Sequence, residues 1–291
     1  MPDTYFNEEW LKLRWAFDRA ARNENVAVAA YANWQTASSK VMVDLGAGLG
    51  ANCAYWAPRL QGVQHWYLIE HDQRLFVPGI QWLARYFAQA QWSHTTQAGA
   101  ELFEGPDCRV GVQYIQGNAE QMAQLVDLKA VNGVMANALL DLLRWDQCHA
   151  LAGILADFRL PLLATINYMG MAFEPADAWD SLLIGLYEQH MTRPQSQGPR
   201  LGKQAVLVLA EMLEKRGYVT VHGPADWVVP PRACSMQRAL LDFMASAIAQ
   251  LDLLPHMRQQ VQAWFQLREQ HVQAQCLTIR VKHVDLWATP R

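Results

Sequence analysis

The chain has 291 residues, of which 52% are hydrophobic and 18% are charged. This composition provides a sizeable core and excludes global disorder. A net charge of −3 without a long basic run argues against a nucleic-acid partner, because phosphate binding needs concentrated Lys and Arg.

Membrane insertion and secretion are not expected either. No stretch of about 18 consecutive apolar residues occurs, which predicts no transmembrane helix. The polar start Met1–Thr4 lacks the apolar run of a signal peptide. Five widely spaced cysteines form no CxxC pair, which is typical of free thiols in a reducing compartment. We therefore expect a cytoplasmic protein.

The first two thirds of the chain alternate between predicted helices and strands. Asn7 is expected to cap a first helix, and residues 24–40 lead from it into the core. The predicted strands are 41–45, 65–70, 110–115, 131–136 and 160–168. The predicted helices are 51–57, 73–91 with an interruption at 78–79, and one from about residue 146, whereas 93–109 is expected to be a loop. This alternation predicts an α/β fold with a doubly wound parallel sheet.

The C-terminal third has a different pattern. It contains an irregular segment, a helix ended by Gly217, a strand, two helical stretches and a half-exposed strand, at residues 170–200, 201–216, 218–222, 232–250, 256–274 and 276–283. No linker divides the chain, so we expect a single domain, 1–291. Within it, 1–40 is an N-terminal helical segment, 41–168 is a cofactor-binding core, and the insertions 170–200 and 225–275 form a substrate cap over one end of the sheet.

A glycine-rich turn, Asp44–Gly50, follows the first predicted strand and precedes a helix. Such a turn places backbone N–H groups and a helix N-terminus at the end of the sheet, where a ligand can approach closely. The pattern alone is weak, because Gly46, Gly48 and Gly50 also fit a dinucleotide-binding sequence or a tight turn without a ligand.

Three neighbouring features narrow this choice. Asp44 lies at the strand end, where a carboxylate suits a cationic amino-acid ligand better than a pyrophosphate. Glu70 ends the second strand, 20 residues after Gly50, and can accept hydrogen bonds from ribose hydroxyls. Asn118 and Ala119 follow the third strand and suit the edge and face of an adenine ring.

These segments together resemble the successive motifs of class I S-adenosylmethionine-dependent methyltransferases. The resembling motifs are Asp44–Gly50, Leu68–Glu70, Gly117–Glu120 and Ala136–Asp141. The resemblance implies a Rossmann-like, doubly wound, seven-stranded and mostly parallel sheet with helical insertions covering the active-site end. A looser resemblance to a bacterial subgroup of small-molecule methyltransferases involves Trp10–Arg14 with Asp18 and Arg22, Gly198–Gly202, Asp226–Trp227 and His283–Leu286.

The resemblance also implies how the cofactor is held. The turn residues Gly46, Ala47, Gly48 and Gly50 would hold the methionine part of S-adenosylmethionine. Glu70, with His71 beside it, would hold the ribose, and Asn118 and Ala119 would contact adenine. Asn137 would lie beside the sulfonium or the methionine amino group. Many family members carry Asp where Asn118 stands.

Two kinds of methyltransferase are disfavoured. The segment Asn137–Leu140 is not the Asn/Asp-Pro-Pro-aromatic loop of enzymes that methylate nucleobase amines. Metal-dependent catechol-type enzymes need acids where Asn137 and Asn167 stand, and no HxxxH pair occurs, so no metal is expected.

Candidates for catalysis and anchoring lie near the strand ends and in the insertions. Asp141, Tyr168 and His190 are candidate catalytic groups; the alternatives are a helix N-terminal charge, a packed core tyrosine and a surface histidine. Arg200 and Trp227 are candidates for substrate binding, or else precede a helix and fill the core. Arg14 either clamps the cofactor carboxylate or pairs with Asp18 along its helix.

The leading hypothesis is methyl transfer to a small-molecule acceptor by in-line displacement. A non-catalytic S-adenosylmethionine-binding sensor or scaffold fits the same motifs, and an NAD(P)-dependent oxidoreductase is disfavoured by Asp44. The sequence identifies neither the acceptor nor whether N, O, S or C is methylated. The aromatic-rich insertions are equally compatible with a homodimer interface.

Overall fold

The computed structural model describes residues 7–37, 39–97, 100–195 and 198–291. Met1–Thr4, on which the signal-peptide expectation depends, lies outside these ranges, as do residues 196–197 of the predicted cap. Among the helices in the described ranges, none is both long enough and apolar enough to span a bilayer.

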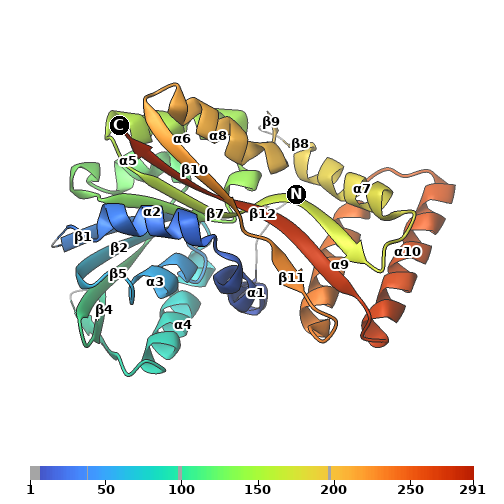
Figure 1. Ribbon diagram of the computed structural model, residues 1–291, viewed down its shortest axis with the longest axis horizontal. Helices are drawn as coiled ribbons and strands as arrows, with labels where there is room; N and C mark the ends of the chain where they lie inside the picture. Colours follow the sequence, from blue (N-terminus) through green and yellow to red (C-terminus); the bar gives the residue numbers. More distant parts are fainter. Residues whose placement is uncertain (1–6, 38, 98–99, 196–197) are drawn as a thin grey trace.

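A ten-stranded mixed sheet forms the centre of the described structure (Figure 1). Its order is β10-β12-β7-β6-β1-β2-β5-β4-β3, with β11 paired to β12. The five central strands, β7, β6, β1, β2 and β5, run parallel, and the outer strands are antiparallel. The strands are β1 (Ser39–Leu45), β2 (Gly62–Glu70), β3 (Ser93–Gln97), β4 (Ala100–Gly105), β5 (Cys108–Gln116), β6 (Gly133–Asn137), β7 (Leu162–Glu174), β10 (Tyr218–Pro224), β11 (Trp227–Val229) and β12 (Thr278–Pro290).

The predicted Rossmann-like fold class is confirmed, but the strand number was wrong. Seven strands, β5-β2-β1-β6-β7-β12-β10, form the expected doubly wound sheet, and β3, β4 and β11 are additional. The segment 93–109, expected to be a loop, forms the hairpin β3–β4, which extends the sheet beyond β5. Hydrophobic periodicity did not indicate this edge hairpin, because β3 buries none of its residues.

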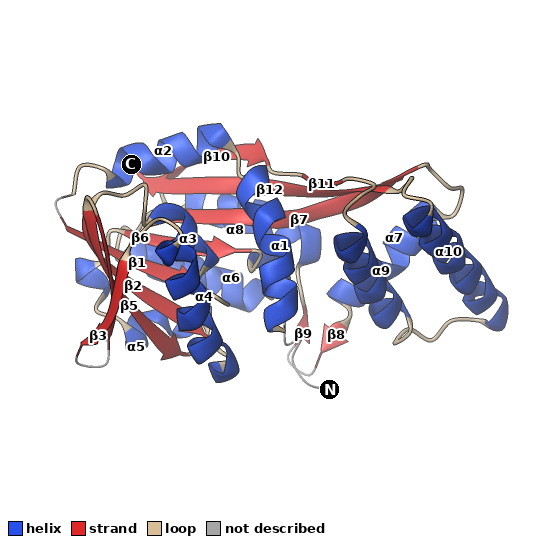
Figure 2. Cartoon of the chain, turned by 90° about the horizontal axis from the view of Figure 1, so that it is seen from below, coloured by secondary structure: helices blue, strands red, loops and turns tan. Residues whose placement is uncertain are grey.

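Helices cover both faces of the sheet (Figure 2). Because successive side chains of a strand point to opposite faces, the strands contribute to two separate hydrophobic clusters. Val43 and Leu45 pack into one cluster with α6 and α8, whereas Met42 packs into the other with Trp34 of α2 and Trp56 of α3. The helices of the first cluster are α5 (Met122–Leu125), α6 (Trp145–Asp157) and α8 (Ala205–Glu214). Those of the second are α2 (Glu24–Trp34), α3 (Ala51–Trp56) and α4 (Phe76–Ala88).

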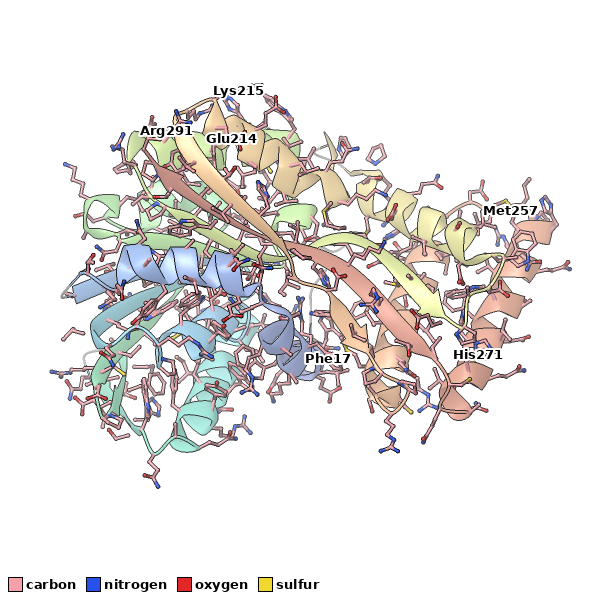
Figure 3. All side chains as sticks on the ribbon, in the orientation of Figure 1. Phe17, Glu214, Lys215, Met257, His271 and Arg291 are labelled. Carbon is pink, nitrogen blue, oxygen red and sulfur yellow. The ribbon has the colours of Figure 1, made fainter. Side chains whose placement is uncertain are left out.

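A third hydrophobic cluster forms a second lobe beyond the core sheet. The strands β7 and β12, each 13 residues long, extend into it and carry α7 (Asp180–Thr192), α9 (Cys234–Ile248) and α10 (Pro255–Gln273). Helix α1 (Glu8–Ala21) lies between the lobes, and its Phe17 contacts Trp227 at 6.3 Å between ring centroids (Figure 3). The predicted irregular insertion 170–200 is therefore largely the end of β7 and a regular helix.

Short elements complete the described chain and correct several boundaries. Pro78 and Gly79 do not interrupt the predicted helix, because Pro78 falls in the first turn of α4, where a missing N–H is tolerated. The 3-10 turns are η1 (Gln73–Leu75), η2 (Ala119–Gln121), η3 (Leu128–Ala130), η4 (Leu140–Leu142) and η5 (Gly202–Gln204), and a small ribbon pairs β8 (Pro194–Gln195) with β9 (Gly198–Pro199).

Candidate functional site

The glycine turn lies where β1 meets α3, at the carboxyl ends of the parallel strands. Gly46 and Gly48 have φ values of 60° and 55°, in the left-handed region that favours glycine. A Cβ atom at Gly48 would lie 3.3 Å from Cδ1 of Leu11 in α1, and one at Gly46 would lie 2.9 Å from Leu139. The turn therefore needs glycine both for its conformation and for the close approach of its neighbours.

Both peptide groups of Gly48 are fixed by neighbouring strands. Its N–H donates to Oε2 of Glu70 at 2.9 Å, and its carbonyl accepts from the Tyr114 hydroxyl at 3.0 Å. Oε1 of Glu70 accepts from the Asp72 N–H at 2.9 Å and lies 2.7 Å from Nδ1 of His71. Tyr114 was missed in the sequence, because its role depends on a strand that no local pattern connects to the turn.

The charge of Glu70 is favoured although its side chain is buried. Burial acts to raise the pKa of this carboxyl, but hydrogen bonds from His71 and from the N–H groups of Asp72 and Gly48 outweigh it. The net pKa is lowered, so Glu70 is an anion at neutral pH. Its carboxylate can accept a further hydrogen bond at the edge of the sheet.

Asp44 lies beneath the turn in a chain of buried polar groups. It accepts a hydrogen bond from Asn52 at 2.7 Å, and Asn52 in turn accepts one from Arg22 at 2.8 Å. Burial raises the pKa of Asp44 to about 7, against the opposing effects of Asn52 and Arg22. Asp44 therefore orders the helix that follows the turn.

The residues predicted to contact adenine lie beside Glu70. The Gly117 N–H donates to the Glu70 carbonyl at 3.2 Å, which holds the end of β5 against the end of β2. Ala119 is buried and Asn118 is exposed. The structure thus brings together Glu70, His71, Asn118 and Ala119.

Helix α1 closes over the turn from the other side. Arg14 pairs with Asp18 at 3.0 Å, so of its two predicted roles the described contacts show the pairing along the helix. Asp18 also accepts from the Asn137 amide at 2.9 Å, which ties α1 to the end of β6. The cavity between α1 and the turn measures about 40 Å³.

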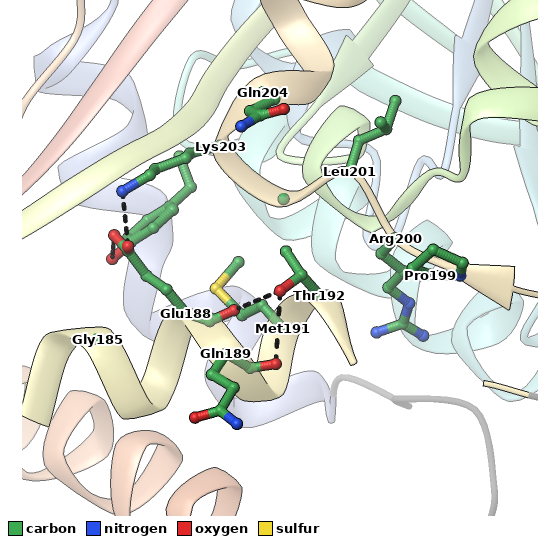
Figure 4. A pocket seen from close by; sticks show the side chains of 12 residues that line it. Gly185, Glu188, Gln189, Met191, Thr192, Pro199, Arg200, Leu201, Lys203 and Gln204 are labelled. Carbon is green, nitrogen blue, oxygen red and sulfur yellow. Dashed lines mark hydrogen bonds and ion pairs between the residues drawn. The ribbon is translucent and has the colours of Figure 1, made fainter. Parts of the chain in front are cut away.

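A second cavity of about 580 Å³ lies between the middle of β7, α7 and η5 (Figure 4). Two of the predicted residues, Tyr168 and Arg200, line it. The Tyr168 hydroxyl lies 3.4 Å from Oε1 of Glu188, and Nζ of Lys203 lies 2.6 Å from Oε2 of the same carboxylate. Burial, together with Tyr187 and Glu188, raises the pKa of Tyr168, so its hydroxyl stays protonated and donates.

Asp141 connects the two cavities electrostatically. Burial raises the pKa of its carboxyl, while the charges of Arg14 at one cavity and Arg200 at the other lower it. Its Oδ1 atom is buried and has no hydrogen-bond partner among the described residues. A buried carboxylate oxygen without a partner is costly, although the Asp141 carboxyl also has a hydrogen bond from its own backbone N–H.

The other two predicted residues lie away from the large cavity. His190 hydrogen-bonds to Gln250, which lies just after α9, and burial lowers its pKa. Trp227 is buried in the second lobe, where its ring centroid lies 5.0 Å from the Arg14 guanidinium and 4.8 Å from the His283 ring.

His283 was not predicted as a site residue, although it lies near the centre of the molecule. It pairs with Tyr168 across β12 and β7. Burial and the neighbouring Arg14 lower its pKa to about 3, so the ring is neutral. The sequence singled out this position only through the looser resemblance at His283–Leu286, which implied no role for the histidine.

The described residues fit S-adenosylmethionine chemically, but the cavity at the turn is smaller than this ligand. The glycine cradle, the ionised Glu70 and the buried Ala119 match the amino-acid, ribose and adenine parts. Pockets for such ligands measure roughly 300–1,000 Å³. The cavity of about 40 Å³ under α1 is bounded by the turn but not by Glu70, Asn118 or Ala119, so it is only one part of the region that the ligand would occupy. In the part of the chain that the structure describes, no cluster of His, Cys, Asp and Glu could hold a metal ion.

No protein-family model and no curated protein sequence matches the chain. It is similar in fold to the YcgJ protein of Bacillus subtilis (TM-score 0.48, 10% identity, 92% of this chain and 99% of that one). Phosphoethanolamine N-methyltransferase 2 of Haemonchus contortus, in complex with phosphomonomethylethanolamine and S-adenosylhomocysteine, gives 0.47 at 10% identity, covering 99% of this chain and 58% of that one. Geranyl diphosphate C-methyltransferase of Streptomyces coelicolor, also with S-adenosylhomocysteine, gives 0.45 at 11% identity, covering 99% and 86%.

Proposed function

We propose that this chain binds S-adenosylmethionine at the glycine turn and transfers its methyl group to a small-molecule acceptor in the cavity of about 580 Å³. The observation that carries the proposal is the adjacency of two sites. The turn is held by the ionised Glu70, and the carboxyl of Asp141 lies within the electrostatic reach of both Arg14 at the small cavity and Arg200 at the large one.

The cofactor-binding residues have separate tasks. Oε2 of Glu70 keeps one lone pair for a ribose hydroxyl while it accepts from the Gly48 N–H, so one side chain couples the shape of the turn to ribose binding. Asp44, beneath the turn, favours a cationic amino group in its ionised form, and such a group would in turn lower its raised pKa. Asn137 is oriented by Thr165, whose hydroxyl donates to its Oδ1 at 2.8 Å, and it turns toward the cofactor when α1 moves.

The transfer needs alignment, exclusion of water and removal of a proton. When bound, S-adenosylmethionine supplies an electrophilic methyl carbon on a sulfonium. The acceptor's lone pair forms the new bond to that carbon, and the electron pair of the broken carbon–sulfur bond stays on sulfur. Asp141 takes the proton that the acceptor loses, and its raised pKa brings it nearer to the working pH of a general base. Tyr168 stays protonated and directs its O–H at Glu188, so its hydroxyl oxygen orients the acceptor by accepting a hydrogen bond.

A non-catalytic sensor is the second candidate. It is favoured by α1, because ligand binding at the turn would displace a helix that contacts Asn137 and the second lobe. Such a displacement can serve signalling as well as closure over a substrate.

Methyl transfer from radiolabelled S-adenosylmethionine into fractionated cell extracts separates enzyme from sensor. We expect label in one small-molecule fraction with the wild-type protein. The Asp141→Asn variant should transfer on the order of 100-fold more slowly while binding S-adenosylhomocysteine normally. Wild-type protein that binds the cofactor but labels no fraction would favour the sensor. Equal rates for wild type and Asp141→Asn would remove the assignment of Asp141.

A further inference from the structure

The charges around the large cavity are unequal. Among the lining side chains that the structure describes, Arg200 and Lys203 are cationic and Glu188 is the one carboxylate. Glu188 is already engaged by Lys203 at 2.6 Å and by the Tyr168 hydroxyl. Two cations against one carboxylate leave the wall with an excess positive charge.

Hydrogen-bond donors also outnumber acceptors on this wall. The guanidinium of Arg200 and the ammonium of Lys203 carry N–H donors and no acceptor, and Lys203 has two N–H groups beyond the one it directs at Glu188. Figure 4 shows Arg200 and Lys203 on opposite sides of the cavity, with the Glu188 carboxylate on the side of Lys203. An anion placed between the two cations would meet donors from both sides.

The backbone adds to this polarity. The helical turn η5 continues directly into α8, so this helix begins at the cavity and directs its partial positive charge toward it. Gly202 makes this close approach possible: its φ is 55°, and a Cβ there would lie 2.8 Å from Cγ2 of Thr192. The helix start is therefore packed against the end of α7, at the cavity wall.

The electrostatic effect of Arg200 extends across the cavity. Its charge lowers the pKa of both Asp141 and His190, in addition to the larger effect that burial has on each. An anionic group held near Arg200 would lie within the electrostatic reach of the carboxyl assigned to proton removal.

We propose that the acceptor carries a carboxylate or phosphate group, which Arg200 and Lys203 bind while the nucleophilic atom lies toward Asp141. That the bound anion is the methyl acceptor rests on the proposed function, whereas the anion-binding site itself does not depend on that function. The shared chemistry is an anionic small molecule. A planar carboxylate or a phosphate both match the guanidinium of Arg200.

The test uses four ring compounds of similar size, measured by ligand-observed NMR on the full chain with S-adenosylhomocysteine present. Benzoate and phenyl phosphate are the anionic probes, benzyl alcohol is neutral, and benzylammonium is cationic. We expect the anions to bind with dissociation constants on the order of 1 mM, at least tenfold more tightly than the other two. Benzoate against phenyl phosphate separates a carboxylate site from a phosphate site.

Variants locate the binding. Arg200→Gln and Lys203→Gln should each weaken the better anion about tenfold, and Lys215→Gln should leave it unchanged. Lys215 is a matched control, because it pairs with Glu211 at 2.5 Å at the outer end of the same helix α8 (Figure 3). Either pocket variant suffices if the other does not fold, as judged by thermal unfolding.

Three results would overturn the inference: benzylammonium binding as tightly as the anions, no anion binding at 10 mM probe, on the order of ten times the expected constant, or anion binding unchanged in both pocket variants. Loss of S-adenosylhomocysteine binding by the wild type would instead count against the proposed function, and the probe affinities would still decide the anion site.

Discussion

The two cavities of this molecule are built in opposite ways. At the glycine turn, both peptide groups of Gly48 are fixed by Glu70 and Tyr114, and the cavity under α1 measures about 40 Å³. The neighbouring cavity measures about 580 Å³ and is lined by long polar side chains from β7, α7 and the 199–204 segment. The hydrogen-bonded turn suits a ligand that related proteins share. The larger cavity, built from segments far apart in the sequence, suits a ligand that differs between related proteins.

The largest expected effect concerns the second lobe, which carries one wall of the larger cavity. Arg268 is fully buried, donates to Asp180 and to the Pro175 carbonyl, and lies 5.0 Å from the Phe173 ring centroid. Arg268→Met should lower the free energy of unfolding by about 3–5 kcal/mol, because Asp180 loses its buried partner. Urea denaturation measures this. Unchanged affinity of this variant for S-adenosylhomocysteine would show that the second lobe and the glycine turn are energetically separate. A loss of binding free energy as large as the loss of stability would show that they are coupled.

Glu70→Ala should weaken S-adenosylhomocysteine binding about 100-fold, or about 2.7 kcal/mol. The variant loses the ribose acceptor and releases the Gly48 N–H. Glu70→Gln is the matched control, because it keeps the shape of the side chain and loses its charge. Its affinity for S-adenosylhomocysteine should lie between those of the wild type and Glu70→Ala. Calorimetry that finds wild-type affinity for Glu70→Ala would remove the ribose assignment.

The pH dependence of stability tests the buried carboxyl beneath the turn. Burial raises the pKa of Asp44 to about 7, so between about pH 4 and 7 the folded chain holds a proton that the unfolded chain releases. Stability should therefore fall as pH rises through this range, by at most about 1.4 kcal/mol per pH unit from this group.

Asp44→Asn should lack that slope. Asp285, whose pKa burial raises to about 6, contributes in the same direction and is present in both proteins, so the difference between wild type and variant isolates Asp44. Parallel curves of unfolding free energy against pH would contradict a protonated Asp44.

The smallest effect concerns α1. If this helix moves outward to admit the cofactor, its contact between Asp18 and Asn137 breaks. Amide hydrogen exchange over residues 8–21 should change severalfold when S-adenosylhomocysteine is added, whereas exchange in β12 should not. Identical exchange of α1 with and without the ligand would mean that the cofactor binds without displacing it.

The same contrast explains what could be predicted from the sequence. The strand, the glycine turn and the helix are contiguous, and Glu70 lies at a fixed distance along the chain, so local patterns locate them. Tyr114 and His283 act through pairing between strands, which no local pattern contains. Lys203 and Glu188 meet only because β7 continues to residue 174 and α7 folds back toward η5.

Two other expectations failed for a different physical reason. The hairpin β3–β4 is exposed and polar, so the hydrophobic periodicity that reveals buried strands is missing. In 170–200, Pro and Gly residues suggested an irregular segment, but Pro175 follows the end of β7 and Gly185 lies within α7. Packing of α7 against α9 in the third cluster overrides the low helix propensity of that glycine.

The central claim is that the glycine turn selects S-adenosylmethionine over a dinucleotide. Calorimetry of the full chain with S-adenosylhomocysteine and with NAD tests it most directly. The account predicts a dissociation constant on the order of micromolar for S-adenosylhomocysteine and binding at least tenfold weaker for NAD. Tighter binding of NAD, or no binding of S-adenosylhomocysteine, would contradict it.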